Sequence, residues 1–368
     1  MSVDVLHVVG ARPNFMKAAP VIRALAEAGF QQNLIHTGQH YDSRMSDVFF
    51  RELEIPEPDV NLGVGSGSHA QQTAQIMASF ETVVLERNPG LVMVYGDVNS
   101  TVAAALVCAK LRVQVAHVEA GLRSRDRSMP EEINRLLTDR LSDLLFTPSE
   151  DANENLEREG ANAAQIHLVG NVMIDTLVRL LPRALEKKKT GFPERYALVT
   201  LHRPANVDDP EVLRGIMNSM HEVAKDLPVV FPVHPRTRLR IQEFAIATEG
   251  IQLCEPLSYL EFLAFEAHAT VVLTDSGGIQ EETTFLGVPC LTLRKNTERP
   301  ITVEVGTNIL VGNSVERLRS ELTKIVDGHP KKGSIPPLWD GHAGERIAQR
   351  LRKTFPSFPA SALAAARD

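Results

Sequence analysis

Short apolar runs alternate with amphipathic segments from one end of the chain to the other. The apolar runs are rich in Val, Ile and Leu, and the segments between them place apolar residues three and four apart, as at Ala18, Val21, Ile22 and Leu25. Runs of the first kind are typical of strands buried on both faces of a sheet, and spacings of the second kind are typical of helices. The pattern therefore predicts an α/β protein with parallel sheets that helices cover on both sides.

The predicted strands fall into two sets of about six, which indicates two doubly wound domains. In the first half of the chain they are Val3–Val9, Gln32–Thr37, Leu91–Tyr95, Gln114–Val118, Leu144–Thr147 and Ile166–Val169. In the second half they are Ala197–Leu201, Val229–Val233, Ile251–Cys254, Thr270–Thr274, Cys290–Leu293 and Asn308–Val311. Such sheets bind ligands beyond the carboxyl ends of their strands, so polar residues that directly follow these runs are candidates for a site.

The boundary between the domains is expected near Gly170–Thr190, where a predicted helix, Met173–Leu185, runs into a charged stretch that ends in glycine. The Pro- and Gly-rich segment Gly328–Gly344 looks like a second crossing, followed by a last helix of about Glu345–Lys353. We therefore predict a first domain of residues 1–170 and a second domain of residues 171–344.

Composition limits the class of protein. A chain of 368 residues with 43% hydrophobic and 23% charged residues is typical of a soluble protein of two domains. The net charge of −7 gives no basic excess for nucleic acid or for an anionic membrane. The N-terminus reads as a strand rather than a signal peptide, and no apolar run of ~18 residues predicts a membrane span. Cys108, Cys254 and Cys290 lie in apolar stretches, which favours buried reduced thiols and a cytosolic protein.

The segment VVGARPNFMK follows the first strand and is suited to an anion. Gly10 permits a tight turn, Arg12 lies where a helix begins, and Lys17 falls in the first turns of that helix. The alternative is an ordinary strand-to-helix turn with solvated cations. No GxGxxG fingerprint occurs, so tight dinucleotide binding in the usual manner is not expected.

Acidic residues follow the next strands of the first half. Asp97 ends one strand and Glu119 the neighbouring one, and Glu131 lies in the first turn of a helix that Pro130 opens. A basic loop lies between the last two acids and contains Arg123, Arg125 and Arg127. Acids that face arginines suit a site that moves protons on a substrate carrying phosphate. The alternative for Asp97 is an N-cap or turn residue, ahead of a helix that Asn99–Thr101 caps.

The segment LTDSGGIQEETTFLGVP is the strongest local motif. A strand stops at Asp275, and Ser276, Gly277 and Gly278 then offer N–H groups at the start of a helix, which makes a nest for a diphosphate. Glu282 comes about one helical turn later and can reach a ribose diol. The alternative is a plain glycine-rich turn.

Four further residues of the second half are candidates. His202 follows its first strand and can meet phosphate or exchange protons, and His234 lies between prolines after the next strand. Phe262 stacks on a base or packs in the core, and Arg299 borders the ligand or pairs with Glu298.

Gln39 and His40 are weaker candidates after the second strand, because a lone His in a loop is more often structural. The sequence has no HxxxH on a predicted helix, no paired CxxC and no GxSxG motif, so neither a metal nor a serine nucleophile is predicted. Two nucleotide-sized domains, an anion nest in the second and acids in the first describe an enzyme acting on a glycosyl group attached to a nucleoside diphosphate. Glycosyl transfer and rearrangement of the sugar both suit such a site.

The motifs GARPNFMKAAP, TGQHYD, VYGDVNST, HVEAGLRS, MPEEINR, TLHRPANV, TDSGGIQEE and TERP occur in this order. Together they closely resemble the non-hydrolysing UDP-N-acetylglucosamine 2-epimerases over about residues 3–350. The resemblance implies two Rossmann-like domains of the glycosyltransferase-B type, with the active site in the cleft between them and no cofactor. It also implies that the C-terminal helix, about residues 345–368, crosses back onto the first domain. It also implies a cytoplasmic homodimer that interconverts UDP-GlcNAc and UDP-ManNAc.

The resemblance further implies the chemistry and the roles of the residues. UDP leaves carbon 1, a carboxylate removes the hydrogen of carbon 2, and UDP returns to 2-acetamidoglucal while a proton is delivered to the other face. Asp97, Glu119 and Glu131 supply the acid and base groups, with Lys17 and His202 assisting, and it stays open which carboxylate is the base. The expected UDP ligands are Arg12, His234, Phe262, Ser276, Gly277, Gly278, Glu282 and Arg299.

The chain departs from many bacterial members, which carry QHRE and HRREN. In those enzymes a second UDP-GlcNAc binds at these positions, which include Gln39 and His40 here, and activates the enzyme. Tyr41 and Pro204 replace two arginines of that site. Allosteric activation is therefore not implied for this chain. An acid commonly follows TERP, and Ile301 replaces it here. These variants also occur in relatives acting on UDP-2,3-diacetamido-2,3-dideoxyglucuronate, so that substrate stays open, as do a glycosyltransferase of the same fold, a hydrolysing epimerase and a UDP-sugar sensor.

Overall fold

The chain divides into two compact units in a computed structural model, which describes residues 4–39, 52–186, 193–312 and 314–356. The first unit runs to Thr176 and takes up the chain again at Pro337. The second unit is Leu177–Pro336, so the boundary falls inside helix α7 (Val172–Leu185). His40 and the KKKTG stretch at 187–191 lie outside the described residues.

The described part of the first unit contains a seven-stranded parallel sheet in the order β3-β2-β1-β4-β5-β6-β7. Its strands are β1 (Val5–Val9), β2 (Gln32–His36), β3 (Val60–Asn61), β4 (Leu91–Tyr95), β5 (Val115–Val118), β6 (Leu144–Thr147) and β7 (Ile166–Leu168). Every residue of β1, β4 and β5 is buried, as expected of strands covered on both faces.

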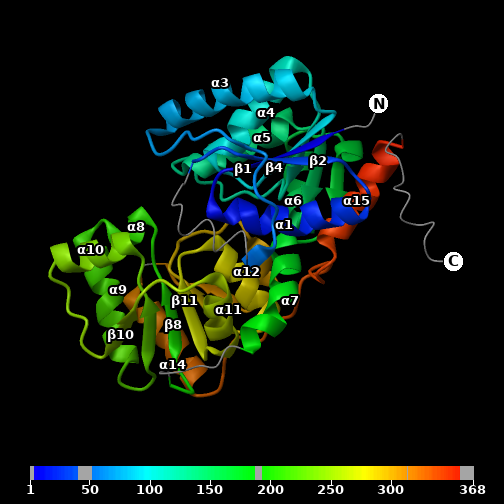
Figure 1. The fold of residues 1–368 in the computed structure, drawn as a ribbon. Helices are drawn as coiled ribbons and strands as arrows, with labels where there is room; N and C mark the ends of the chain where they lie inside the picture. Colours follow the sequence, from blue (N-terminus) through cyan, green and yellow to red (C-terminus); the bar gives the residue numbers. More distant parts are fainter. Residues whose placement is uncertain (1–3, 40–51, 187–192, 313, 357–368) are drawn as a thin grey trace. The chain divides into compact units, whose positions relative to one another are not determined.

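Helices cover both faces of this sheet (Figure 1). They are α1 (Arg12–Glu27), α3 (His69–Arg87), α4 (Asn99–Leu111), α5 (Pro130–Leu141), α6 (Glu150–Arg158) and α15 (Ala343–Thr354), with a short 3₁₀ turn at Ala163–Gln165. Helices α3, α4 and α5 pack side by side on one face, and α1 packs with α15 on the other. This arrangement leaves the carboxyl ends of the strands as the edge at which polar residues gather.

Residues far apart in the sequence complete the first unit where α15 packs on α1. Pro20 lies inside α1 and has no N–H for the carbonyl of Met16, and the hydroxyl of Thr176 donates to that carbonyl at 2.6 Å. The carboxylate of Asp175 accepts the first two backbone N–H groups of α15, at 3.0 and 2.7 Å. The end of the chain is therefore a structural part of the unit that its beginning forms.

The described part of the second unit contains a six-stranded parallel sheet in the order β10-β9-β8-β11-β12-β13. Its strands are β8 (Ala197–Thr200), β9 (Val229–Pro232), β10 (Ile251–Cys254), β11 (Val271–Thr274), β12 (Cys290–Thr292) and β13 (Asn308–Leu310). Its helices are α8 (Pro204–Val207), α9 (Pro210–Val223), α10 (Pro235–Glu243), α11 (Tyr259–His268), α12 (Gly277–Leu286), α13 (Pro300–Glu304) and α14 (Val315–Val326).

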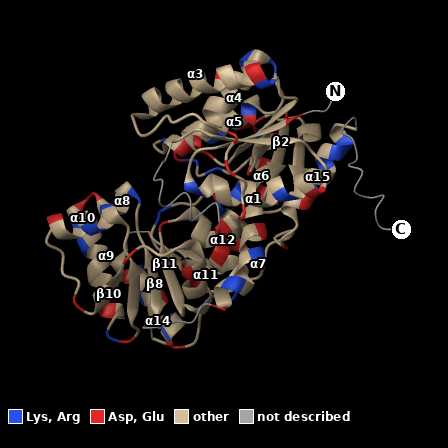
Figure 2. Cartoon of the chain, in the orientation of Figure 1, with Lys and Arg blue, Asp and Glu red and all other residues tan. Residues whose placement is uncertain are grey.

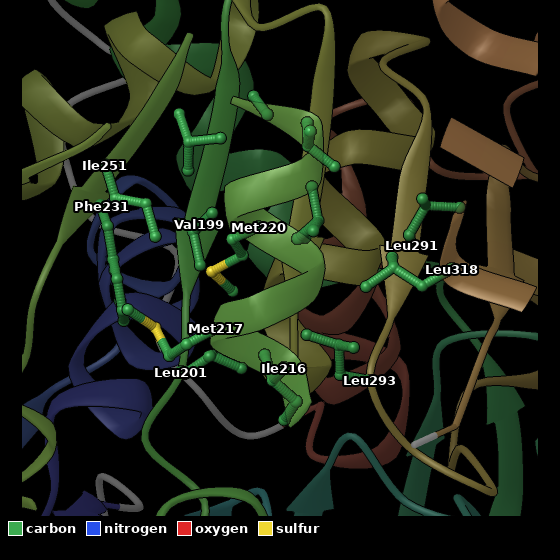
Figure 3. Packing of buried hydrophobic residues seen from close by; sticks show 14 of the residues in the cluster. Val199, Leu201, Ile216, Met217, Met220, Phe231, Ile251, Leu291, Leu293 and Leu318 are labelled. Carbon is green, nitrogen blue, oxygen red and sulfur yellow. The ribbon is translucent and has the colours of Figure 1, made fainter. Parts of the chain in front are cut away.

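Alternate residues of the central strands enter opposite cores of this unit. Val199 and Phe231 lie with Met217 and Met220 of α9 in a core that also includes residues of α14 (Figure 3). Leu198 and its neighbours on the other face pack against residues of α11 and α12. Because successive side chains of a strand point to opposite faces of the sheet, each central strand contributes to two apolar layers.

The prediction of two doubly wound parallel domains is confirmed, and every predicted strand is present. The short strand β3 was not predicted, because two residues give no readable pattern. Lysines, arginines and acids are interspersed over both units in the view of Figure 2. Within the described ranges, no helix combines the length and the apolar character needed to cross a bilayer.

Candidate functional site

The first unit brings Lys17 and Glu119 together at the carboxyl edge of its sheet. The amino group of Lys17, in α1, donates to the carboxylate of Glu119, which directly follows β5, and both side chains are buried. Glu119 has a φ of 75°, a left-handed conformation that a residue with a side chain adopts at a cost of about 1 kcal/mol or more. Strain of this kind at a strand end is typical of a functional position.

Gly96 leaves the space that the Lys17–Glu119 pair occupies. A β-carbon at this position would lie 2.6 Å from Lys17 Nζ and 3.2 Å from Glu119 Oε2. Gly96 also has a φ of 60°, so the turn after β4 requires a residue without a side chain on both counts. Asp97 is the next residue of the chain and belongs to this turn.

Asp97 is held by an arginine that the sequence did not single out. Arg135, in α5, donates to Asp97 Oδ2 at 2.5 Å and to Glu132 Oε2 at 2.7 Å. Burial alone would raise the pKa of Glu132, but hydrogen bonds from the backbone of Ser124 and from Arg135 outweigh it and lower that pKa. Asp97 retains 23% exposure of its side chain, whereas Arg135 is buried. Asp97 is thus the member of this cluster that faces outward.

A second buried cluster, His117, Asp139 and Arg123, lies next to these strand ends. His117, inside β5, lies 2.6 Å from Asp139 Oδ1 and 2.8 Å from the carbonyl of Gly96. Arg123 lies 2.7 Å from Asp139 Oδ2 and binds Glu159. Arg123 was expected in a basic loop that faces acids; it is buried, and the carboxylates that it pairs with are those of Asp139 and Glu159.

The remaining candidates of the first unit lie in different settings. Glu131 is half-buried in the first turn of α5, and Arg12 is exposed at the first residue of α1. Gln39 is buried, and its Oε1 accepts the backbone N–H of Ser100 at 3.0 Å and its hydroxyl at 2.6 Å. The expected cap of α4 from Asn99–Thr101 is wrong, since Val98 is the N-cap without a side-chain bond and Gln39 supplies the acceptor.

The second unit brings His202 and Asp275 together at the carboxyl ends of the neighbouring strands β8 and β11. His202 Nδ1 lies 3.1 Å from Asp275 Oδ1, and the imidazole side chain is 49% exposed. Asp275 is fully buried and accepts further bonds from the backbone of Arg203 at 2.9 Å and from Asn206 at 3.1 Å. Asp275 was noted only as the end of a strand, and its role as a partner of His202 was missed.

Ser276 is the N-cap of α12, and Gly277 is its first residue. The cap residue makes no side-chain cap bond, so backbone N–H groups at this end suit an anion. A β-carbon on Gly277 would lie 2.5 Å from Arg299 Nη1 and 2.6 Å from Glu298 Oε1, so glycine permits this close approach. Gly278 follows in the first turn and is half-buried.

Arg299 belongs to a buried ionic network behind that end of α12. It pairs with Glu298 at 2.5 Å and with Glu281 at 2.8 Å, and Glu298 also binds Arg294 at 2.7 Å. Burial would raise the pKa of Glu298, but Arg299 and Arg294 hold it well below its ordinary range. Of the two alternatives given for Arg299, pairing with Glu298 is therefore present in the structure.

Glu282 lies one turn into α12 and is buried beside another carboxyl group. Its Oε1 accepts the hydroxyl of Tyr259 at 2.8 Å. Burial and the neighbouring Glu282 raise the pKa of Glu266 well above its ordinary value.

Phe262 is half-buried and packs against the core on this face of the sheet. His234 is an exposed N-cap of α10, whose Nδ1 accepts the backbone N–H of Arg236 at 3.3 Å.

Cysteine and metal chemistry have no evident place in the described residues. Burial raises the pKa of the Cys108 and Cys290 thiols to about 12, and Cys254 is half-buried rather than buried. Over the ranges that the structure describes, no group of three His, Cys, Asp or Glu side chains could hold a metal ion. Cavities of about 540 and 570 Å³, one in each unit, contain none of the predicted site residues.

Each unit thus offers a different chemistry. In the first, Asp97 and Glu119 end neighbouring strands and present two carboxylates, each with a cation behind it, which suits proton transfer. In the second, a helix N-terminus and a histidine held by a buried aspartate suit a diphosphate.

Comparison with known proteins gives one consistent result. The family model described as UDP-N-acetylglucosamine 2-epimerase matches residues 23–352. A UDP-N-acetylglucosamine 2-epimerase of Methanocaldococcus jannaschii is 44% identical over 358 residues, 94% of this chain and 97% of that protein. A UDP-2,3-diacetamido-2,3-dideoxy-D-glucuronate 2-epimerase of Pseudomonas aeruginosa is 43% identical over 359 residues, 95% of this chain and 99% of that protein. The crystal structure of Methanocaldococcus jannaschii UDP-GlcNAc 2-epimerase in complex with UDP-GlcNAc and UDP has a TM-score of 0.89 at 44% identity, covering 95% of this chain and 99% of that one.

Proposed function

The chain belongs to the UDP-N-acetylglucosamine 2-epimerase family, and from this premise we propose that it reversibly converts UDP-GlcNAc to UDP-ManNAc. The family resemblance and the glycosyltransferase-B type of its two Rossmann-like domains are confirmed. The observation that carries the proposal is the pair of carboxylates, Asp97 and Glu119, at the ends of adjacent strands. An isomerase that moves one proton between two faces of a sugar needs two such groups.

The chemistry explains why UDP must leave. The hydrogen on carbon 2 has no adjacent carbonyl and is poorly acidic. When the bond from carbon 1 to the UDP oxygen breaks, its electron pair goes to UDP, and carbon 1 becomes oxocarbenium-like. A carboxylate then takes the proton of carbon 2, and that C–H electron pair forms the double bond of 2-acetamidoglucal. In the return step a proton reaches the opposite face of carbon 2 and UDP adds to carbon 1 again.

We assign the acid and base roles to the first unit. Glu119 is held by Lys17, and Asp97 is held by Arg135, so each carboxylate has a fixed position and a nearby cation. Glu131, half-buried in the first turn of α5, is a third carboxylate in the proposal. Each cation fixes the orientation of its carboxylate, and a group that transfers a proton to or from carbon 2 must be held in place.

We assign the binding of UDP to the second unit. The N-terminus of α12 offers backbone N–H groups and the positive end of the helix dipole to the diphosphate. His202 adds a donor beside it. Glu282, Phe262, His234 and Arg299 complete the proposed UDP ligands of this unit, and Arg12 of the first unit is a further proposed ligand. Because the charge that develops on UDP is largest as the bond to carbon 1 breaks, fixed donors at this place lower the barrier.

A second substrate has specific support. The relative that acts on UDP-2,3-diacetamido-2,3-dideoxy-D-glucuronate is 43% identical to this chain, close to the 44% of the UDP-GlcNAc enzyme. Both reactions invert carbon 2 of a UDP-sugar with an acetamido group there, so the same carboxylates serve either.

We also propose that the enzyme is a cytoplasmic homodimer, for which light scattering of the purified protein would give twice the 40.5 kDa mass of one chain.

Exchange of solvent deuterium tests the proposal. The enzyme is incubated in deuterated water with UDP-GlcNAc, with UDP-2,3-diacetamido-2,3-dideoxyglucuronate and with UDP-glucose, which lacks the acetamido group. We expect UDP-ManNAc labelled at carbon 2 and no free sugar. Label only in the glucuronate would assign the second substrate. Free ManNAc would identify a hydrolysing enzyme, and absence of label in every UDP-sugar would reject epimerisation.

A further inference from the structure

Asp275 makes more contacts with the His202 loop than a residue that merely ends a strand requires. Its carboxylate accepts from the His202 backbone N–H at 3.1 Å, from the Arg203 backbone N–H at 2.9 Å and from Asn206 Nδ2 at 3.1 Å. Its other oxygen lies 3.1 Å from the imidazole Nδ1 of His202. Every one of these groups belongs to the segment directly after β8, so one buried carboxylate fixes that segment and its ring.

The charge of Asp275 is also settled by these contacts. Burial would raise its pKa, but the hydrogen bond and the charge of His202 and the donors of Arg203 and Asn206 outweigh burial, and its pKa lies below the ordinary value. An ionised carboxylate can only accept hydrogen bonds. His202 Nδ1 must therefore carry a hydrogen, and Nε2, the other ring nitrogen, is the one left for a ligand on the exposed side.

The position of Asp275 in the chain joins this histidine to the anion nest. Asp275 is followed directly by Ser276, the N-cap of α12, and by Gly277. The same residue thus orients the imidazole and begins the turn whose N–H groups are proposed to bind the diphosphate. A ring whose Nδ1 is bonded to a carboxylate is also held in one orientation.

We propose that Asp275 is a positioning residue that orients His202 toward the leaving diphosphate. This inference rests on the proposed function. Nε2–H donates a hydrogen bond to the phosphate oxygen that receives the electron pair from carbon 1, and the proton remains on nitrogen. Asp275 holds the ring in place through Nδ1–H and balances its charge, so its contribution is made as the bond to UDP breaks rather than when UDP-sugar binds.

Kinetics of Asp275→Asn test this division. We expect kcat to fall about 100-fold or more, as for other histidines that lose their orienting carboxylate. KM and the dissociation constant of UDP, measured by calorimetry, should stay within about threefold. Asp208→Asn is the control, because Asp208 is an aspartate of the same unit that pairs with Arg236 and Arg240 rather than with His202. Unchanged kcat in Asp275→Asn, or an equal loss in Asp208→Asn, would overturn the proposal.

A double-mutant cycle separates positioning from a merely structural effect. In a His202→Asn background, Asp275→Asn should change kcat by less than about threefold, since its target is already absent. A full additional loss would show that Asp275 acts elsewhere. The single and double variants are compared for melting temperature, so that a folding defect is recognised.

Nitrogen NMR of the wild-type protein gives a result that does not depend on the folding of the Asp275→Asn variant. With ¹⁵N-labelled histidine, Nδ1 of His202 should carry a hydrogen, assigned by its loss in His202→Asn. A bare Nδ1 would overturn the inference. This readout also separates the two proposals: an enzyme that labels no UDP-sugar with deuterium refutes the proposed function, whereas the NMR result bears on the Asp275–His202 pair alone.

Discussion

The amino group of Lys17 contacts the carboxylate of Glu119 although 102 residues separate them in the sequence. The relative exposures of the two side chains are 6% and 4%, so neither charge is solvated by water. Gly96 leaves room for the pair, because a β-carbon at this position would lie 2.6 Å from Lys17 Nζ. The enzyme therefore contains a carboxylate whose position is determined by three segments of the chain at once.

Replacing Lys17 by Met should destabilise the protein by about 3–5 kcal/mol, because it removes the positive charge that contacts the buried Glu119 carboxylate. The double variant Lys17→Met, Glu119→Gln removes both charges and should recover part of that loss. Urea unfolding followed by circular dichroism measures both. A single variant within 1 kcal/mol of wild type, or a double variant no more stable than the single, would contradict the burial of an uncompensated charge.

Asp97→Asn and Glu119→Gln should each lower the rate of deuterium incorporation about 10²–10⁴-fold, because each removes an acid or base group but keeps the size of the side chain. UDP affinity should be nearly unchanged, since neither residue is a proposed UDP ligand. Glu154→Gln is the control, because Glu154 makes only an exposed ion pair with Arg158 on α6. Near-normal rates in both site variants would show that the acid–base site lies elsewhere.

Asp175 should make stability depend on pH. Burial raises its pKa to about 6 from the ordinary 3.8, although the N–H groups of α15 oppose this. Between these values the folded protein binds more protons than the unfolded chain, so this contribution is present below pH 4 and is lost as pH rises through 6. Relative to Asp175→Asn, the wild-type free energy of unfolding should fall by on the order of 2–3 kcal/mol between about pH 4 and pH 7. Parallel curves for the two proteins would exclude a raised pKa.

Two helical glycines should respond in opposite ways to alanine. A β-carbon on Gly344 would lie 2.8 Å from the carbonyl oxygen of Pro20, so Gly344→Ala should destabilise the contact of α15 with α1 by about 1–3 kcal/mol. Gly215, in α9, has its nearest neighbour at 3.9 Å, so Gly215→Ala should stabilise by about 0.5–1 kcal/mol through its helix propensity. Thermal unfolding under identical conditions measures both, and a shift of the same sign in both variants would refute this contrast.

Strands were predictable from sequence because parallel strands buried on both faces consist of consecutive apolar residues, as Leu91–Tyr95 does. The candidate edge followed from the same pattern, since Asp97, Glu119 and His202 directly succeed such runs. Strand β3 escaped, because Val60–Asn61 contributes one apolar residue and pairs only with β2.

Partners of the site residues were not predictable. Nothing in the local sequence joins Arg135 to Asp97, Asp275 to His202, or Gln39 to the start of α4, because each pair meets only after the sheet has brought distant strand ends together. A buried histidine inside a strand, His117, was a usable signal. A histidine in an apolar run needs polar partners, and here these are Asp139 and the carbonyl of Gly96.

The return of α15 to the first unit has a consequence for biosynthesis. A ribosome releases residues 4–176 long before Ala343, so the nascent first unit waits with one face of α1 uncovered and with the carboxylate of Asp175 unoccupied. The second unit, Leu177–Pro336, is contiguous and can mature meanwhile. The first unit, whose synthesis begins first, is therefore the last to be completed. A stop codon ahead of Ala343 would leave an intact second unit attached to an incomplete first unit.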